Sequence, residues 1–146
     1  MIEMLLVVSL AGRRAVLPAI AVNSVIEVAE VTPVPRTASH VAGLAALRSR
    51  PLTLIDCAAS LGAAHELTDP RACRAVVVEH QGHLYGLLVE AADDIVAAQS
   101  EPGPLGADPG PGWSRVATGR VETEAGALPF LDIGALIAGP DESLAA

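Results

Sequence analysis

Short runs of aliphatic residues recur along the whole chain, and turn-forming residues separate many of them. Runs of a few Val, Leu and Ile residues bounded by Gly, Pro and polar residues are typical of β-strands. The pattern therefore predicts a mostly β protein, built as a sandwich or a barrel. The predicted strands cover residues 5–10, 15–20, 25–31, 52–55, 75–79, 84–89, 94–98, 115–121 and 128–131.

Two short helices fit between these strands, at residues 58–61 and 134–137. Each begins just after an Asp, and the side chains of Asp56 and Asp132 are expected to cap the two helices at their N-termini. Gly62 follows the first helix, where a C-terminal cap favours a positive φ.

A Gly- and Pro-rich segment lies in the second half of the chain, at residues 102–112. Eight of its eleven residues are Gly or Pro. Such a composition disfavours both a central strand and a helix. We therefore expect an exposed, mobile surface loop that tolerates shortening. The adjacent pair Asp93-Asp94 is expected to mark a solvated turn.

The two halves of the chain resemble each other. At an offset of 70 residues, Val7-Val8 matches Val77-Val78 and Leu17 matches Leu87. At an offset of 76 residues, Leu54-Ile55-Asp56 parallels Phe130-Leu131-Asp132. One interpretation is coincidence among strands rich in Val and Leu. The other is two related β-subdomains that pack as a pseudo-twofold pair around a shared core.

Composition excludes several classes of protein. The 146 residues are 51% hydrophobic, which is enough to bury a core and is unlike a disordered chain. With three aromatic residues, an aromatic platform for single-stranded nucleic acid is not expected. All nine basic residues are Arg, against 17 acidic ones, so the net charge is −8. This balance argues against nucleic acid and anionic membranes as partners, and the absence of Lys excludes Schiff-base and Walker-type chemistry.

No catalytic, cofactor or metal motif stands out. The chain contains no G-x-S-x-G, G-x-G-x-x-G, P-loop or H-E-x-x-H sequence. His80 and His83 flank the turn at Gln81-Gly82 and could face each other across a hairpin, but solvated turn histidines are far commoner than a metal site. We predict a protein that is not an enzyme and that holds neither a cofactor nor a metal.

Cysteine usage and hydropathy predict a soluble cytoplasmic protein. Cys57 and Cys73 form neither a C-x-x-C motif nor a Cys/His cluster, and we interpret them as reduced thiols. The apolar run at residues 4–10 is far shorter than the roughly 20 residues that span a bilayer. Glu3 precedes that run, whereas a signal peptide begins with positive charge.

Two charged residues lie in aliphatic surroundings. On a strand, Glu27 shares a face with Val25, Ala29 and Val31. Arg48 follows the apolar stretch at residues 43–47. Because an unpaired charge on an apolar face is costly, we predict that Glu27 and Arg48 form an ion pair at least half shielded from water.

Four blocks of sequence together resemble the CheW family. Residues 41–62 (VAGLAALRSRPLTLIDCAASLG) resemble its V-x-G-L-x-x-L-R-G-x-x-x-P-V-I-D-L signature, which runs into a short helix ending in L-G. Residues 7–28, with V-I-E-V at the end, resemble the family opening, and residues 86–90 and 131–137 resemble its G-L-x-V-D and terminal L-D-x-x-x-L blocks. The chain departs from the pattern at Ser49, which replaces a Gly, at the early Pro51, at Cys57-Ala58-Ala59 and at Glu90.

The resemblance implies a fold and a function. The expected fold is two intertwined five-stranded SH3-like β-barrels with a pseudo-twofold relation and a few short helices. They would form one domain over residues 1–146, with subdomains built from about 15–70 and 75–137 and strands exchanged at the ends. The implied function is a non-catalytic adaptor that couples chemoreceptor tips to the regulatory domain of the histidine kinase CheA, in cytoplasmic arrays at the inner membrane.

By the same resemblance, the receptor-facing groove maps to Val25, Glu27, Gly43 and Arg48, and the kinase contacts fall on apolar barrel edges. Two alternatives stay open at this point. One is a small β-barrel that binds a metabolite or acts as a hydrolase through an unrecognised site. The other is a CheW-like adaptor for pilus motility or another signalling cluster.

Overall fold

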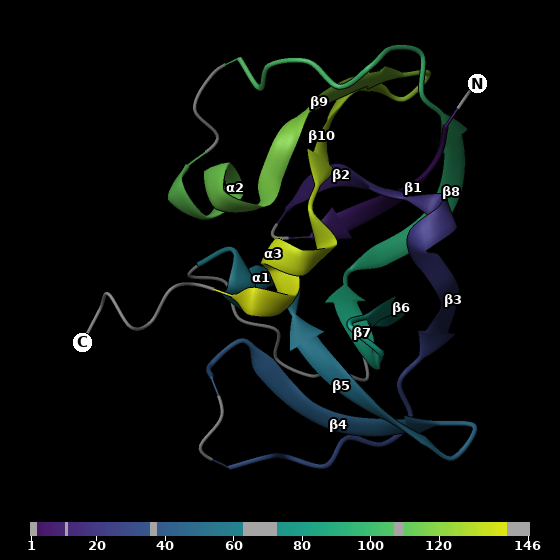
Figure 1. Ribbon diagram of the computed structural model, residues 1–146, viewed down its shortest axis with the longest axis vertical. Helices are drawn as coiled ribbons and strands as arrows, with labels where there is room; N and C mark the ends of the chain where they lie inside the picture. The colour runs from purple at the N-terminus through teal and green to yellow at the C-terminus, as the bar shows by residue number, and fades with distance from the viewer. Residues whose placement is uncertain (1–2, 11, 36–37, 63–72, 107–109, 140–146) are drawn as a thin grey trace.

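Two five-stranded sheets form the body of the protein (Figure 1). The computed structural model describes residues 3–10, 12–35, 38–62, 73–106 and 110–139. The strands are β1 (Met4–Leu10), β2 (Arg13–Pro18), β3 (Val22–Glu27), β4 (Val41–Leu47), β5 (Arg50–Asp56), β6 (Arg74–His80), β7 (His83–Val89), β8 (Ala91–Ala97), β9 (Ala117–Thr123) and β10 (Gly126–Leu131). The helical elements are the 3-10 turn η1 (Ala19–Ala21) and the helices α1 (Cys57–Ser60), α2 (Pro111–Val116) and α3 (Ile133–Ala138).

The two sheets have the same internal order. The first sheet runs β8-β1-β2-β10-β9 and the second runs β3-β6-β7-β5-β4. Strands that occupy the same place in the two sheets are those related by the offsets of 70 and 76 residues, such as β1 with β6 and β10 with β5. The first barrel combines β1 and β2 from the first half of the chain with β8, β9 and β10 from the second half. The second barrel combines β3, β4 and β5 from the first half with β6 and β7 from the second, so that β3 pairs with β6 and β8 pairs with β1. This is the predicted fold of two intertwined five-stranded barrels with a pseudo-twofold relation.

The correspondence reaches single backbone contacts. Thr32 bridges to Leu44 in the second barrel, and Gly103 bridges to Arg120 in the first. Beside each bridge lies a glycine whose added Cβ would come within 2.7 Å of a carbonyl oxygen, Gly43 against Thr32 and Gly119 against Gly103. The two halves of the chain therefore have the same backbone arrangement. Coincidence among strands rich in Val and Leu does not account for this repeated arrangement.

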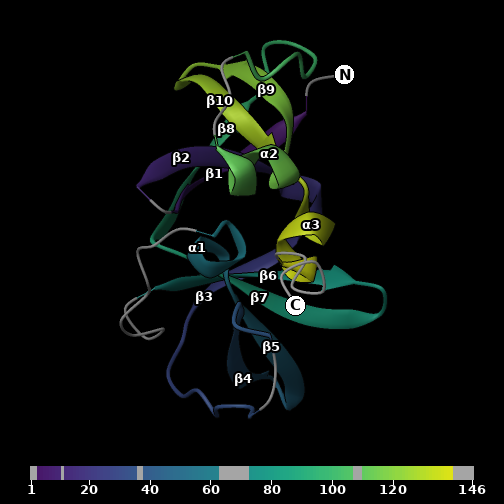
Figure 2. The ribbon, with the colours of Figure 1, turned by 90° about the vertical axis from the view of Figure 1, so that its left-hand side faces the viewer.

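The largest core cluster lies between the two barrels and contains residues from both halves of the chain. Leu10, Leu17, Ile55, Leu87 and Leu131 in this cluster are almost completely buried. Smaller clusters fill the second and the first barrel. Helices α1 and α3 pack between the two sheets (Figure 2). There the hydroxyl of Ser60 donates to the carbonyl of Leu136, 76 residues further along, at a distance of 2.7 Å. The contact between these two equivalent positions indicates that they lie close to the pseudo-twofold axis.

Local sequence signals predicted the helix ends correctly. The amide of Ala59 donates to Oδ1 of Asp56 at 3.1 Å, and the amide of Gly134 donates to Oδ1 of Asp132 at 3.0 Å. Both aspartates therefore cap their helices as expected. Gly62 has a φ of +72°, which also agrees with the prediction.

The segment at residues 102–112 is not an unstructured loop. Gly103 exchanges two backbone hydrogen bonds with Arg120 on β9, of 2.8 and 2.9 Å. Helix α2 begins at Pro111, because Pro fits the first turn of a helix, where the missing N–H is not needed. An added Cβ on Gly112 would lie 1.6 Å from the Leu61 carbonyl oxygen. The prediction of a mere loop is therefore wrong at Gly103 and from Pro111 onward. Residues 102, 104 and 106 are exposed as expected, tolerance to shortening stays a prediction, and residues 107–109 lie outside the described chain.

Other strand predictions need smaller corrections. Strand β4 was not among the predicted strands, and β3 ends at Glu27 instead of continuing to residue 31. Residues 115 and 116 belong to α2, so β9 begins only at Ala117. Asp93 and Asp94 lie within strand β8 rather than in a turn, because β8 extends along β1 from Ala91.

Candidate functional site

The four residues singled out from the sequence lie on the second barrel, three of them on strands at opposite edges of its sheet and one in a turn. Val25 and Glu27 belong to the edge strand β3, Gly43 belongs to the other edge strand β4, and Arg48 lies in the turn between β4 and β5. The chain that leaves β3 crosses between these edges, since Thr32 exchanges hydrogen bonds of 2.8 Å with Leu44 on β4. This segment thereby links the two edges of the sheet and closes the barrel. Among the described interactions, none joins Glu27 to Arg48.

Glu27 pairs with a different arginine. Its carboxylate accepts a hydrogen bond from the guanidinium of Arg74 on the neighbouring strand β6, at the directly opposed register position. The side chains of Arg74 and Glu27 are 48% and 79% exposed. The predicted shielded Glu27–Arg48 pair is therefore wrong. Its premise fails because Ile26 and Val28 face the core, so that Glu27 points outward on the opposite face, where water solvates a carboxylate.

Gly43 has a backbone role. It is buried, its φ is +147°, and an added Cβ would lie 2.7 Å from both the Thr32 carbonyl oxygen and Cγ1 of Val31. Both the torsion and the space exclude a side chain here. Gly43 thus allows the crossing segment to lie directly on β4, and it would support a binding surface by shaping the barrel.

The turn that carries Arg48 has an unusual backbone. Arg48 and Ser49 have φ values of +51° and +70°, as the two central residues of a tight hairpin turn whose twist matches that of the strands. Glycine adopts such torsions most easily, which explains why the family signature places a Gly at position 49. The side chain of Arg48 is exposed at the tip of this hairpin.

Several large aliphatic side chains are exposed, and sequence alone could not distinguish them from core residues. Ile20, on η1, is 95% exposed. Ile95 on β8 and Met4 on the neighbouring strand β1 are about half exposed. Val25 and Leu44 lie on the two edge strands of the second sheet. Three of the four edge strands thus present a large aliphatic side chain to solvent.

A cleft of about 370 Å³ lies between the end of β10 with α3 and the end of β6. His80, at its border, makes an edge-on ring contact with Tyr85 at 6.3 Å between centroids. Within the described residues, no three His, Cys, Asp or Glu side chains come together as a metal site would require. The cleft is lined by Pro18, Ala21, Glu79, His80, Thr118, Phe130, Leu131, Asp132, Ile133 and Gly134.

The cysteines lie away from any such surface. Cys57 and Cys73 are both buried, and neither forms a disulfide in the described structure. Burial raises the pKa of the Cys57 thiol, and the negative charge of Asp56 raises it further. A thiol that keeps its proton is a poor nucleophile, so Cys57 has a packing role. No helix among the described residues is long and apolar enough to cross a membrane.

The family model for the CheW-like domain matches residues 4–140, nearly the whole chain. The chain belongs to the CheW-like family. Its structure is similar to the crystal structure of the scaffolding protein TtCheW from Thermoanaerobacter tengcongensis, with a TM-score of 0.80, 22% sequence identity, and coverage of 93% of this chain and 92% of that one. A search of curated proteins gave no match. CheW-like proteins are scaffold adaptors rather than enzymes, which agrees with the role expected from the sequence.

Proposed function

We propose that this CheW-like protein is a non-catalytic adaptor that couples chemoreceptor tips to the regulatory domain of the histidine kinase CheA in cytoplasmic arrays. The family membership over residues 4–140 carries this proposal. The exposed aliphatic residues on three edge strands support it, because an adaptor needs more than one surface for partners. The receptor and the kinase would each take one of these surfaces.

For the receptor we propose the face of the second barrel that carries Val25 and Glu27, together with the hairpin tip at Arg48. Val25 is 38% exposed, next to the solvated Glu27–Arg74 pair. An aliphatic side chain surrounded by charged ones is typical of a protein-binding surface, in which a small apolar centre is rimmed by polar groups. Gly43 would contribute by holding the crossing segment in place.

For the kinase we propose the opposite barrel, where Ile95 and Met4 lie on neighbouring strands. They are 50% and 46% exposed, and Ile95 belongs to the edge strand β8. Separate barrels would let one chain bind both partners at once, which coupling requires.

Binding of purified partners tests this assignment. The full chain is titrated by calorimetry with a receptor cytoplasmic fragment and with the CheA regulatory domain encoded in the same genome. Glu27→Arg should weaken receptor binding about tenfold or more and leave kinase binding unchanged, since it reverses a charge at the proposed contact. Ile95→Asp should do the reverse, because it places a charge in an apolar contact.

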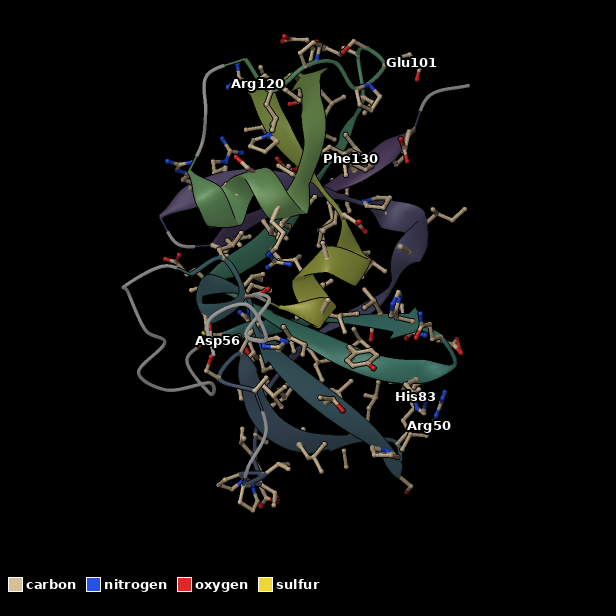
Figure 3. All side chains as sticks on the ribbon, turned by 60° about the vertical axis from the view of Figure 1, so that its left-hand side comes forward. Arg50, Asp56, His83, Glu101, Arg120 and Phe130 are labelled. Carbon is tan, nitrogen blue, oxygen red and sulfur yellow. The ribbon has the colours of Figure 1, made fainter. Side chains whose placement is uncertain are left out.

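The matched control is Glu101→Arg, which makes the same charge reversal at an exposed residue on the other barrel from Glu27 and outside strands β1 and β8 (Figure 3). It should leave both affinities within twofold of the original. Failure of the unmodified chain to bind either partner would refute the adaptor role. Equal loss of both affinities in Glu27→Arg would refute the division between barrels.

A further inference from the structure

The edge strands β3 and β8 occupy equivalent places in the two sheets (Figure 1), and each carries an exposed aliphatic residue at the same position. Val25 on β3 is 38% exposed, and Ile95, which lies 70 residues further along on β8, is 50% exposed. The residues directly opposed to them are Val76 and Leu6, both buried in the core cluster between the barrels. Because directly opposed residues lie on the same side of a sheet, Val25 and Ile95 extend the apolar surface of that cluster toward solvent.

The two strands differ in the cross-strand pair that comes next. Glu27 lies directly opposite Arg74 on β6, and the two side chains form an exposed ion pair. At the equivalent positions of the other sheet, Ala97 lies opposite Met4 on β1, which is 46% exposed. Each pair is two residues along its edge strand from the exposed aliphatic residue, so that it lies on the same face. We call these the charged face, formed by Val25, Glu27 and Arg74, and the apolar face, formed by Met4, Ile95 and Ala97.

The fold does not require the ion pair. An exposed ion pair stabilises a protein very little, because water screens the two charges. The other sheet keeps the same antiparallel pairing with an alanine and a methionine at these positions. The ion pair therefore constrains what can bind on the charged face more than it constrains folding.

The ion pair changes which partner surfaces the face can accept. An apolar partner surface would remove water from the carboxylate of Glu27 and the guanidinium of Arg74, whose side chains are 79% and 48% exposed, without offering hydrogen bonds in return. The same surface would pack on Met4 and Ile95 without such a cost and would gain from their burial. Specificity between two similar faces can arise from charges that the wrong partner would have to desolvate.

We infer that this cross-strand pair determines which face accepts the kinase. The Glu27–Arg74 ion pair excludes the apolar contact surface of the kinase regulatory domain from the charged face, and Met4 with Ala97 admits that surface to the apolar face. The identity of the partner rests on the proposed function, which assigns the kinase to the first barrel. The difference between the two faces does not, since it lies in the strand registers and the exposures themselves.

Moving the ion pair from one barrel to the other tests this inference. The apolar-face variant, Met4→Arg with Ala97→Glu, places two opposite charges on the apolar face without changing the net charge of the chain. The charged-face variant, Glu27→Ala with Arg74→Met, makes the charged face identical to the apolar face at these two positions. Calorimetry of the full chain with the CheA regulatory domain encoded in the same genome measures the affinity for the kinase.

The apolar-face variant should bind the kinase domain about tenfold more weakly or worse, because binding would then desolvate two charges. The protein with all four substitutions should bind about tenfold more tightly than that variant, because the second barrel then carries the apolar face. Far-UV circular dichroism and urea unfolding show whether each protein is folded. If the apolar-face variant does not fold, Met4→Gln replaces it, since it adds polarity at a half-exposed position with little change in size, and unchanged affinity would then overturn the inference.

The matched control is Arg120→Met with Glu122→Ala, which makes the same side-chain changes at exposed positions of β9, the opposite edge strand of the first sheet. Added to the apolar-face variant, it should restore no binding. Unchanged kinase affinity in the apolar-face variant, or no recovery in the folded protein with all four substitutions, would overturn the inference and leave the proposed function intact. An unmodified chain that does not bind the kinase domain would refute the proposed function and this inference together.

Discussion

Arg115, near the end of α2, joins the two helices that lie at the pseudo-twofold axis. Its guanidinium donates to the Ala135 carbonyl of α3 at 2.6 Å and to the Ser60 carbonyl of α1 at 2.6 Å, with a further bond of 3.1 Å to the Ser60 hydroxyl. Ser60 ends α1, where the last carbonyls of a helix have no partners within the helix and a cation is favourable. The Ala135 carbonyl also accepts a hydrogen bond of 3.1 Å from the amide of Gly139. Replacing Arg115 by Met removes these donors while keeping a flexible apolar stem.

The expected loss follows from the number and surroundings of these bonds. Hydrogen bonds to charged groups stabilise a protein by about 1.5 to 3 kcal/mol each when well buried. Arg115 is only partly buried, and its burial lowers the pKa of the guanidinium, which shows that desolvation offsets part of the gain. Counting the two short carbonyl bonds at the lower limit, we expect Arg115→Met to lower the free energy of unfolding by about 3 kcal/mol. That loss corresponds to a decrease of roughly 10 °C in the melting temperature for a chain of this size.

Urea unfolding followed by far-UV circular dichroism measures this change. The control is Arg50→Met at the exposed start of β5, labelled in Figure 3, where an effect within about 0.5 kcal/mol is expected. Arg115→Lys should fall between the two, because one ammonium group cannot reproduce the forked bonding to both helices. An Arg115→Met protein whose stability lies within about 0.5 kcal/mol of the original would refute the view that this side chain holds the helices together.

Three further predictions concern the backbone and the thiol. Ser49→Gly should raise the free energy of unfolding by about 0.5 to 1 kcal/mol, because Ser49 has a φ of +70°, which Gly adopts at less cost. A lower urea midpoint than that of the original protein would contradict this. Gly112→Ala should cost about 3 kcal/mol or more, because the new Cβ would lie 1.6 Å from the Leu61 carbonyl oxygen. Gly82→Ala, whose Cβ meets nothing within 4 Å, should cost only about 1 to 2 kcal/mol in the same assay. Burial raises the pKa of Cys57, so above pH 9.0 the thiol ionises in the unfolded chain but keeps its proton in the folded protein. The free energy of unfolding should therefore fall above pH 9.0, by up to about 1.4 kcal/mol per pH unit. The Cys57→Ala variant should lose this contribution to the slope.

Local signals were enough for much of the fold. The aliphatic runs located most strands, and the aspartates at positions 56 and 132 located two helix starts, because capping depends on residues that are neighbours in sequence. Strand β4 escaped notice because three of its seven residues are Ala, which has little preference for strands. The Gly-rich segment was misinterpreted in part because Gly112 is required by its close approach to Leu61, a contact between segments distant in sequence.

The candidate site shows where sequence reasoning stops. The period of two along β3 correctly separates Val25 and Glu27 from Ile26 and Val28, but it does not say which of the two sets faces the core. Glu27 finds its partner 47 residues away, at Arg74, and only the pairing of β3 with β6 brings them together. Choosing Arg48 as the partner assumed that both charges needed burial, which the exposed face of β3 makes unnecessary.

The repeated backbone suggests how one chain could serve several partners. The residues that the two halves share determine the backbone conformation. Gly12 and Gly82 both adopt a positive φ, and Gly43 and Gly119 both allow a carbonyl oxygen to approach closely. Asp56 and Asp132 both cap helices. Positions that differ change what lies at the surface: His80 borders the cleft, whereas the equivalent Leu10 is buried in the core. Because the shared residues hold the same frame in each half, the remaining positions can diverge without loss of the fold. Distinct surfaces on the two barrels follow from that division, and so does an open cleft beside His80 where the equivalent Leu10 is packed in the core.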